Sequence, residues 1–202
     1  MFCSVALVLL VDTSGSISSE NMLLQRDAYV QAFQEPRIRN IILSQAPVAL
    51  SYVEWNSSPR EVVKWTLIET EGDLEEFSQA IFKGASVSSQ GQTGLGEALD
   101  FALASFHHTP CEEIGRMVID ISGDGISNYG QHPAPVRDSA QKEPQVQING
   151  LPILNTQEPT LEPYYRENVI TYDGFLIPVE GYTAIYGALV RKLNREIANV
   201  TQ

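Results

Sequence analysis

The feature that most constrains this chain is an unbroken apolar run over residues 5–11, which ends abruptly in a polar segment that begins with Asp12. Seven apolar residues without polar alternation predict a strand buried on both faces, as in a parallel sheet between two helical layers. In such sheets, ligands bind just beyond the carboxyl ends of the strands. The carboxylate of Asp12 and the hydroxyls of Ser14 and Ser16 therefore predict one half of a divalent-cation site.

Strand and helix patterns alternate along the rest of the chain. Further strands are predicted over 48–55, 61–68, 116–122 and 146–152, with a last strand region over 168–170 and 175–178. Helices are predicted from Ser19 to before Pro36, over 72–82, 94–106 and 136–141, briefly around Tyr164, and over 182–198. Residues 48–55 and 61–68 are too close for a crossover helix, so they form an antiparallel hairpin whose second strand lies at an edge. These patterns predict a doubly wound α/β sheet with one antiparallel edge strand.

The composition predicts one domain over 1–202, because 202 residues at 43% hydrophobic content can bury a single core and no linker divides them. The chain has 13 basic and 25 acidic residues and a net charge of −12, which argues against nucleic acid or an anionic membrane surface as the partner. No apolar run reaches the roughly 20 residues that cross a bilayer, so we expect no membrane insertion. A monomer is the default expectation.

The two cysteines, Cys3 and Cys111, each precede a predicted strand by a few residues. If those two strands are parallel neighbours, both thiols lie at the same end of the sheet and a disulfide could join them. A disulfide would indicate an oxidising compartment. The alternative is a pair of unrelated buried thiols, and the spacing alone does not decide between the two.

The other half of the cation site is expected from two more loops. Thr93 lies in a glycine-rich loop that opens a helix, and Asp124 follows the strand over 116–122. A hard cation such as Mg²⁺ prefers six oxygen ligands, more than Asp12, Ser14 and Ser16 can provide. If the loops converge at one sheet edge, Thr93 and Asp124 complete the set.

In order and spacing, these segments resemble the three motifs of a von Willebrand factor A-type (vWA) domain. The segments are Asp12-Thr13-Ser14-Gly15-Ser16, Gln92-Thr93-Gly94 and Gly123-Asp124-Gly125. The resemblance implies a Rossmann-like fold with six strands in the order 3-2-1-4-5-6, mainly parallel, with helices on both faces. In that order the strands after Cys3 and Cys111 are adjacent, so the resemblance favours the disulfide.

The same resemblance implies a metal-ion-dependent adhesion site (MIDAS). Ser14, Ser16 and, in the ligand-competent state, Thr93 would contact the metal, while Asp12 and Asp124 would act largely through water. The cation expected is Mg²⁺, with Mn²⁺ or Ca²⁺ as alternatives.

A narrower resemblance, to a leader-bearing bacterial branch of the vWA family with uncharacterised function, covers nearly the whole chain. It rests on the segments Leu24-Gln25-Arg26-Asp27, Tyr52-Val53-Glu54-Trp55, Val118-Ile119-Asp120-Ile121-Ser122-Gly123-Asp124-Gly125, Ile148-Asn149-Gly150-Leu151-Pro152-Ile153 and Tyr164-Tyr165-Arg166. This resemblance implies a periplasmic or secreted protein. One departure concerns the site: many relatives have threonine where this chain has Gly123, so the missing hydroxyl changes how Asp124 is held.

The function expected is that of a binding module, not an enzyme. Neutral hydroxyls leave a cation under-neutralised, so it would take a carboxylate from an Asp or Glu of a protein partner. Loop residues expected on the same face, and therefore candidates to select the partner, are Asn128, Tyr129, His132 and Tyr164. Two alternatives stay open: a Mg²⁺-dependent hydrolase or phosphoryl-transfer enzyme with Asp12 as nucleophile, and a scaffold that binds no metal.

Three other patterns are interpreted as structural. Asp120 is expected to be a buried, structurally paired carboxylate and not a metal ligand. His107 and His108 with Cys111 form too weak a pattern for a zinc site. The loop over 91–96 lacks the Lys-Ser/Thr ending of a phosphate-binding loop, which argues against nucleotide binding.

Overall fold

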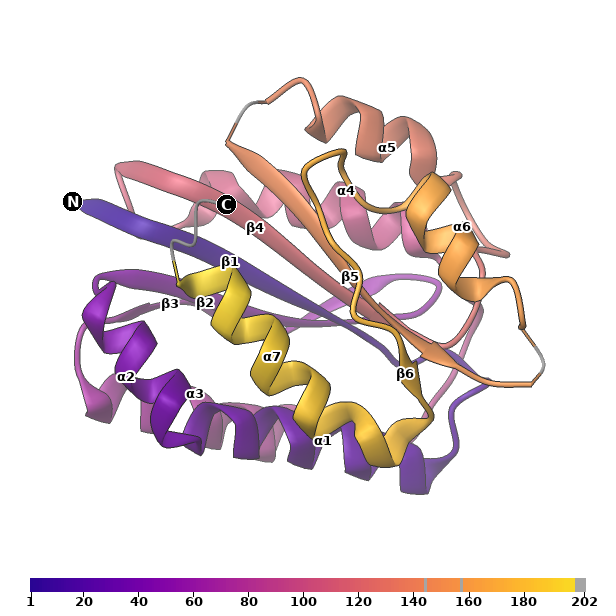
Figure 1. Cartoon of the computed structure of the whole chain (residues 1–202), viewed down its shortest axis with the longest axis horizontal. Helices are drawn as coiled ribbons and strands as arrows, with labels where there is room; N and C mark the ends of the chain where they lie inside the picture. Colours follow the sequence, from indigo (N-terminus) through magenta and orange to yellow (C-terminus); the bar gives the residue numbers. More distant parts are fainter. Residues whose placement is uncertain (144, 157, 199–202) are drawn as a thin grey trace.

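A computed structural model describes residues 1–143, 145–156 and 158–198. Its centre is a six-stranded sheet with the order β3-β2-β1-β4-β5-β6 (Figure 1). The strands are β1 (Phe2–Asp12), β2 (Val48–Trp55), β3 (Pro59–Ile68), β4 (Glu113–Gly123), β5 (Val146–Leu154) and β6 (Val179–Glu180). Strands β2 and β3 pair antiparallel, and the other neighbours pair in parallel. The predicted vWA-like α/β fold and strand order are confirmed.

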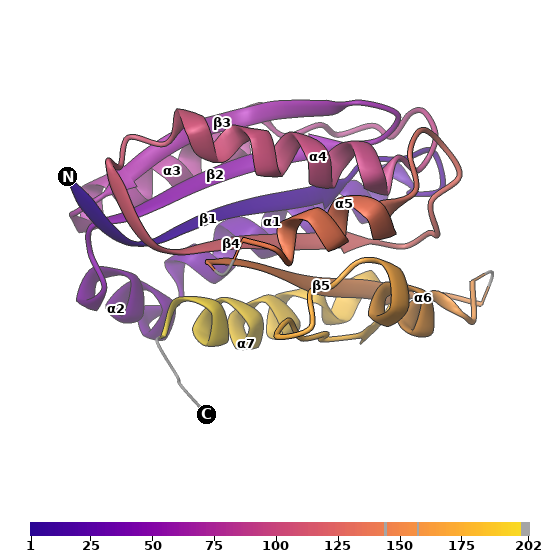
Figure 2. The same cartoon turned by 90° about the horizontal axis from the view of Figure 1, so that it is seen from above.

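Helices cover both faces of the sheet (Figures 1 and 2). One face packs against α1 (Ser19–Gln34), α2 (Pro36–Ser44), α3 (Glu71–Gly84) and α7 (Ile185–Ile197). The other face packs against α4 (Leu95–Ser105), α5 (Pro133–Ala140) and α6 (Leu161–Asn168). Two short 3-10 helices, η1 (Phe106–His108) and η2 (Tyr182–Ala184), follow α4 and precede α7.

The apolar run of β1 supplies both cores of the molecule. Leu7 and Leu9 point into the core beneath α1 and α7, while Val8 and Leu10 point into the core beneath α4. All four are fully buried. Burying one such side chain stabilises the fold by about 1.5–3 kcal/mol, and the apolar residues at every position of 5–11 therefore anchor both layers.

Two elements differ from the sequence prediction. Residues 36–44 form α2, which begins with Pro36 in its first turn, where a missing N–H costs nothing. The last strand was expected before residue 179, but β6 is only Val179–Glu180, and Leu176 makes a single isolated bridge to Gly150. Pro178 interrupts the pairing because it has no N–H to donate.

A disulfide joins Cys3 to Cys111, with their Cα atoms 5.8 Å apart. It lies where β1 and β4 begin to pair, so the neighbouring-strand condition for the bond is met. Closing a loop of this length stabilises a chain by about 4–5 kcal/mol in the chain-entropy account. No helix within the described ranges is long and apolar enough to cross a membrane.

Candidate metal centre

The first site residue, Asp12, is the last residue of β1 and is fully buried. The backbone N–H of Ser14 donates to Asp12 Oδ1 at 2.7 Å, which turns the chain sharply after the strand. From α1, the Gln25 side chain donates to the Asp12 carbonyl at 2.9 Å. The second carboxylate oxygen, Asp12 Oδ2, is buried and accepts no hydrogen bond from any described residue.

The hydroxyls of Ser14 and Ser16 link the first motif to Asp124 of the third motif through hydrogen bonds. Ser14 Oγ lies 3.2 Å from Ser16 Oγ, and Ser16 Oγ donates to Asp124 Oδ1 at 2.7 Å. Ser14 and Asp124 are buried, whereas Ser16 is exposed. The cluster is therefore reached from solvent on the Ser16 side.

Thr93 is held beside the third motif by the loop over 126–129. Its backbone N–H donates to Asn128 Oδ1 at 2.8 Å, and its carbonyl accepts from the Asn128 N–H at 2.9 Å. A side-chain atom built on Gly125 would lie 3.4 Å from Thr93 Oγ1, so this hydroxyl faces the chain next to Asp124. Thr93 itself is 5% exposed.

The loop before Thr93 is also tied to the first motif. The Gly15 N–H donates to the Gly91 carbonyl at 3.0 Å, and the Gln90 N–H donates to the Thr13 carbonyl at 3.0 Å. Gly91 has φ of +77°, a conformation that favours glycine. The three motifs thus lie together at the carboxyl ends of β1 and β4.

The electrostatics of the site arise from two buried carboxylates close together. Burial and, to a smaller extent, the neighbouring charge of Asp124 together raise the pKa of Asp12 to about 7. A divalent cation would offset the repulsion between the two groups. The donor set consists of oxygens alone, and Asp12 Oδ2 lacks a protein partner, so these residues fit a hard cation.

His107, His108 and Cys111 do not form a zinc site, because the sulfur of Cys111 is bonded to Cys3. Across the part of the chain that the structure describes, no group of three or more His, Cys, Asp or Glu side chains is placed to hold a metal. Hydroxyl oxygens would therefore have to contribute at the Asp12 site.

With the fold and the cluster established, comparison with known proteins identifies the family. A family model described as "Protein of unknown function (DUF1194)" matches residues 2–201. The chain belongs to the DUF1194 family. No curated protein matches this DUF1194 sequence.

The solved structures similar to this DUF1194 chain include vWA domains. Proximal thread matrix protein 1 from the mussel byssus has a TM-score of 0.70 and 16% identity, over 95% of this chain and 47% of its own. The von Willebrand factor type A protein from Catenulispora acidiphila has a TM-score of 0.68 and 13% identity, over 96% and 43%. The PilB minor pilin from Streptococcus sanguinis has a TM-score of 0.72 and 12% identity, over 96% and 61%. The chain thus spans about half the length of the first of these, and the likeness shows a common fold.

The residues expected to select a partner differ in their roles. The Asn128 side chain holds the Thr93 backbone, and the His132 ring accepts from the Ala134 N–H at the start of α5. Tyr129 is 44% exposed, and the Tyr164 ring lies edge-on to His132 with centroids 6.2 Å apart. Asn128 and His132 thus have structural hydrogen bonds that the sequence did not indicate.

Asp120 lies away from the cluster, as expected for a paired structural carboxylate. It is fully buried and forms an ion pair with Lys192 at 2.7 Å. Lys192, on α7, also pairs with Glu196 at 2.5 Å. One buried ammonium is shared between two buried carboxylates.

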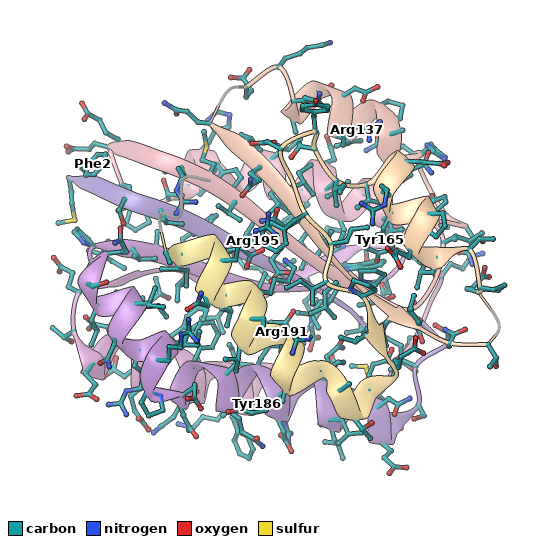
Figure 3. The ribbon with its side chains drawn as sticks, in the orientation of Figure 1. Phe2, Arg137, Tyr165, Tyr186, Arg191 and Arg195 are labelled. Carbon is teal, nitrogen blue, oxygen red and sulfur yellow. A yellow bond between two sulfur atoms is a disulfide. The ribbon has the colours of Figure 1, made fainter. Side chains whose placement is uncertain are left out.

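Sequence reasoning missed two tyrosines that border the site, Tyr165 on α6 and Tyr182 on η2. Tyr165 lies between α6 and the sheet (Figure 3). The sequence shows two adjacent tyrosines, Tyr164 and Tyr165, and only helical phase relative to Leu161 could indicate that Tyr165 points inward.

Proposed function

We propose that this DUF1194 domain is a binding module that holds a divalent cation and uses it to bind a carboxylate of a protein partner. The proposed ligand set is Asp12, Ser14, Ser16, Thr93 and Asp124, with Mg²⁺ as the first choice of cation. The observation that carries the proposal is the 2.7 Å hydrogen bond from Ser16 to Asp124. It joins the first and third motifs beside a buried carboxylate oxygen that has no protein partner.

The chemistry of the donors determines what the site would do. Three of the five proposed ligands are neutral hydroxyls, so the protein supplies little charge beyond its two carboxylates. When bound, the cation would keep attraction for an external anion. Ser16 is exposed, and a partner's Asp or Glu could approach on that side, where charge pairing at the edge of a buried site is strong.

Two further observations support this function over a metal-silent scaffold. A structure of the mussel thread protein with 15% identity and a TM-score of 0.68 is described as having a "zinc occupied MIDAS motif". In the present chain, the Asp12–Asp124 repulsion raises the pKa of Asp12 beyond the effect of burial. A scaffold that binds no metal would gain nothing from two buried carboxylates that repel each other.

Asp12 is a poor candidate for the nucleophile of a hydrolase or phosphoryl-transfer enzyme. Its side chain is fully buried, and Oδ1 already accepts from the Ser14 N–H. The ammonium of Lys192 is committed to Asp120 and Glu196. We therefore propose a non-enzymatic role, in a single domain over 1–202 and in an extracytoplasmic compartment where the Cys3–Cys111 disulfide is maintained.

Titration calorimetry with Mg²⁺ and Mn²⁺ tests this proposal. The wild type should bind one ion, and Asp12→Ala should abolish the heat while the protein stays folded. Asp100→Asn removes one exposed carboxylate on α4 and serves as the matched control, with binding unchanged. Absence of metal-dependent heat in the wild type at millimolar ion would favour the scaffold, and phosphatase or esterase turnover lost in Asp12→Asn would favour an enzyme.

A further inference from the structure

Gly123, just before Asp124, lies in a crowded position that no larger residue could occupy without displacing its neighbours. A side-chain Cβ built there would approach Asp12 Oδ2 to 2.8 Å, Tyr165 Oη to 2.8 Å and the Trp55 ring to 3.0 Å. The carboxylate oxygen and the phenol oxygen thus border the same point from different elements.

Both oxygen atoms at this point lack other hydrogen-bond partners. Asp12 Oδ2 and Tyr165 Oη are buried, and neither has a partner among the described residues. A buried hydroxyl without a partner costs free energy relative to a phenylalanine ring of the same shape. The hydroxyl of Tyr165 is therefore best explained by an interaction with the neighbouring carboxylate of Asp12.

The phenol of Tyr165 is available as a hydrogen-bond donor. Burial raises the pKa of Tyr165 well above its ordinary value, and the charge of Asp12 acts in the same direction. The Tyr165 hydroxyl therefore keeps its proton, while Asp12 Oδ2 can only accept a hydrogen bond when the carboxylate is ionised.

We propose that Tyr165 is a positioning residue of the cation site, whose hydroxyl donates to Asp12 Oδ2 when the cation is bound. This inference rests on the function proposed above. The hydrogen bond would fix the orientation of the Asp12 carboxylate in the loaded site. Helix α6 would thereby contribute to cation affinity without contacting the cation.

The test compares Tyr165→Phe with the wild type in two measurements, the Tm of the metal-free protein and the Mn²⁺ Kd from calorimetry. Tyr52→Phe is the matched control, because Tyr52 is as deeply buried but packs edge-on against Tyr29. We expect the metal-free Tm of Tyr165→Phe to stay equal or rise, because its hydroxyl has no partner there, while its Mn²⁺ Kd weakens by fivefold or more. The control should leave the Kd unchanged.

Three outcomes would overturn the inference. If the wild type binds Mn²⁺ and Tyr165→Phe binds it within twofold of the wild type, Tyr165 does not position the Asp12 carboxylate and the proposed function survives. If the metal-free Tm falls while the Kd is unchanged, the Tyr165 hydroxyl serves folding alone. If the wild type itself shows no Mn²⁺ binding, the proposed function fails and this inference fails with it.

Discussion

The hydroxyl of Ser16 donates to Asp124 Oδ1 at 2.7 Å, although the two residues are 108 positions apart in the sequence. Ser16 follows the first parallel strand and Asp124 follows its neighbour, so the sheet order brings them to one edge. This contact closes the oxygen cluster on its exposed side. It is the most accessible part of the proposed cation site.

Ser16→Ala should therefore weaken metal binding with a modest effect on the fold. We expect the Mn²⁺ Kd to rise by tenfold or more, and the free energy of unfolding to fall by about 1 kcal/mol, because a partly exposed hydrogen bond is lost. Calorimetry and urea unfolding measure the two quantities. Ser44→Ala, at an exposed serine bonded to the Ile41 carbonyl, should leave the Kd unchanged; an equal loss in both variants would contradict a specific role for Ser16.

Gly123→Ala should lower both the stability of the protein and the metal affinity of the site. Its Cβ would come within 3.0 Å of Asp12, Tyr165 and Trp55, so we expect a loss of about 1–3 kcal/mol in stability from overpacking and weaker Mn²⁺ binding. Gly187→Ala on α7 is the control, since its Cβ would meet only the flexible Arg191 side chain at 3.6 Å. That change should be neutral or slightly stabilising, and a Gly123→Ala protein as stable as the wild type would refute the crowding argument.

The buried charges beneath α7 predict a pH dependence of stability. Burial and repulsion from Asp120 raise the pKa of Glu196, Lys192 and Asn149 act against them, and the net result is a pKa of about 8. The pKa in the folded state thus lies above the ordinary value of 4.5, and the folded state retains a proton that the unfolded state releases. Stability from this group is present below about pH 5 and is lost as the pH rises towards 8.

Glu196→Gln tests that dependence. In urea unfolding between pH 5 and 9, the variant should lose less stability with rising pH than the wild type, because the amide cannot ionise and can still accept from Lys192. Taking the difference between the two proteins cancels the contribution of Asp12, which titrates in an overlapping range. Parallel stability curves for the two proteins would show that Glu196 does not ionise in this range.

The disulfide should stabilise the fold without taking part in binding. Cys3 lies at the start of β1 and Asp12 at its end, so the bond and the cluster are at opposite ends of the sheet. Replacing both cysteines with serine should lower the free energy of unfolding by about 2–5 kcal/mol. At a temperature where the variant is folded, its Mn²⁺ Kd should match that of the wild type; a weaker Kd would show coupling between the two ends.

The sequence was sufficient for the parts of the molecule that depend on pattern and order. The apolar run over 5–11 predicted a doubly covered strand, and the strand order brings Asp12 and Asp124 to the same end of the sheet. Helix α2 was missed because Pro36 ends one helix and begins the next. The last strand was misplaced because apolar residues around Phe175 pack beside β5 with little pairing.

The surroundings of the cluster could not be predicted because they depend on tertiary contacts. Nothing local to Gly123 indicates that Asp12 and Tyr165 crowd it, since those residues come from β1 and α6. The role of Asn128 in holding Thr93 likewise appears only once the two loops are side by side. Motifs thus identified the candidate ligands, while the residues that support them emerged from packing.

The most direct test of the central claim is a crystal structure of the protein grown with Mn²⁺, with the ion located by its anomalous scattering. The account predicts one Mn²⁺ at the end of β1, contacted by Ser14 and Ser16 and lying between Asp12 and Asp124. An ordered site without an anomalous peak at millimolar Mn²⁺, or a peak only elsewhere on the molecule, would contradict it.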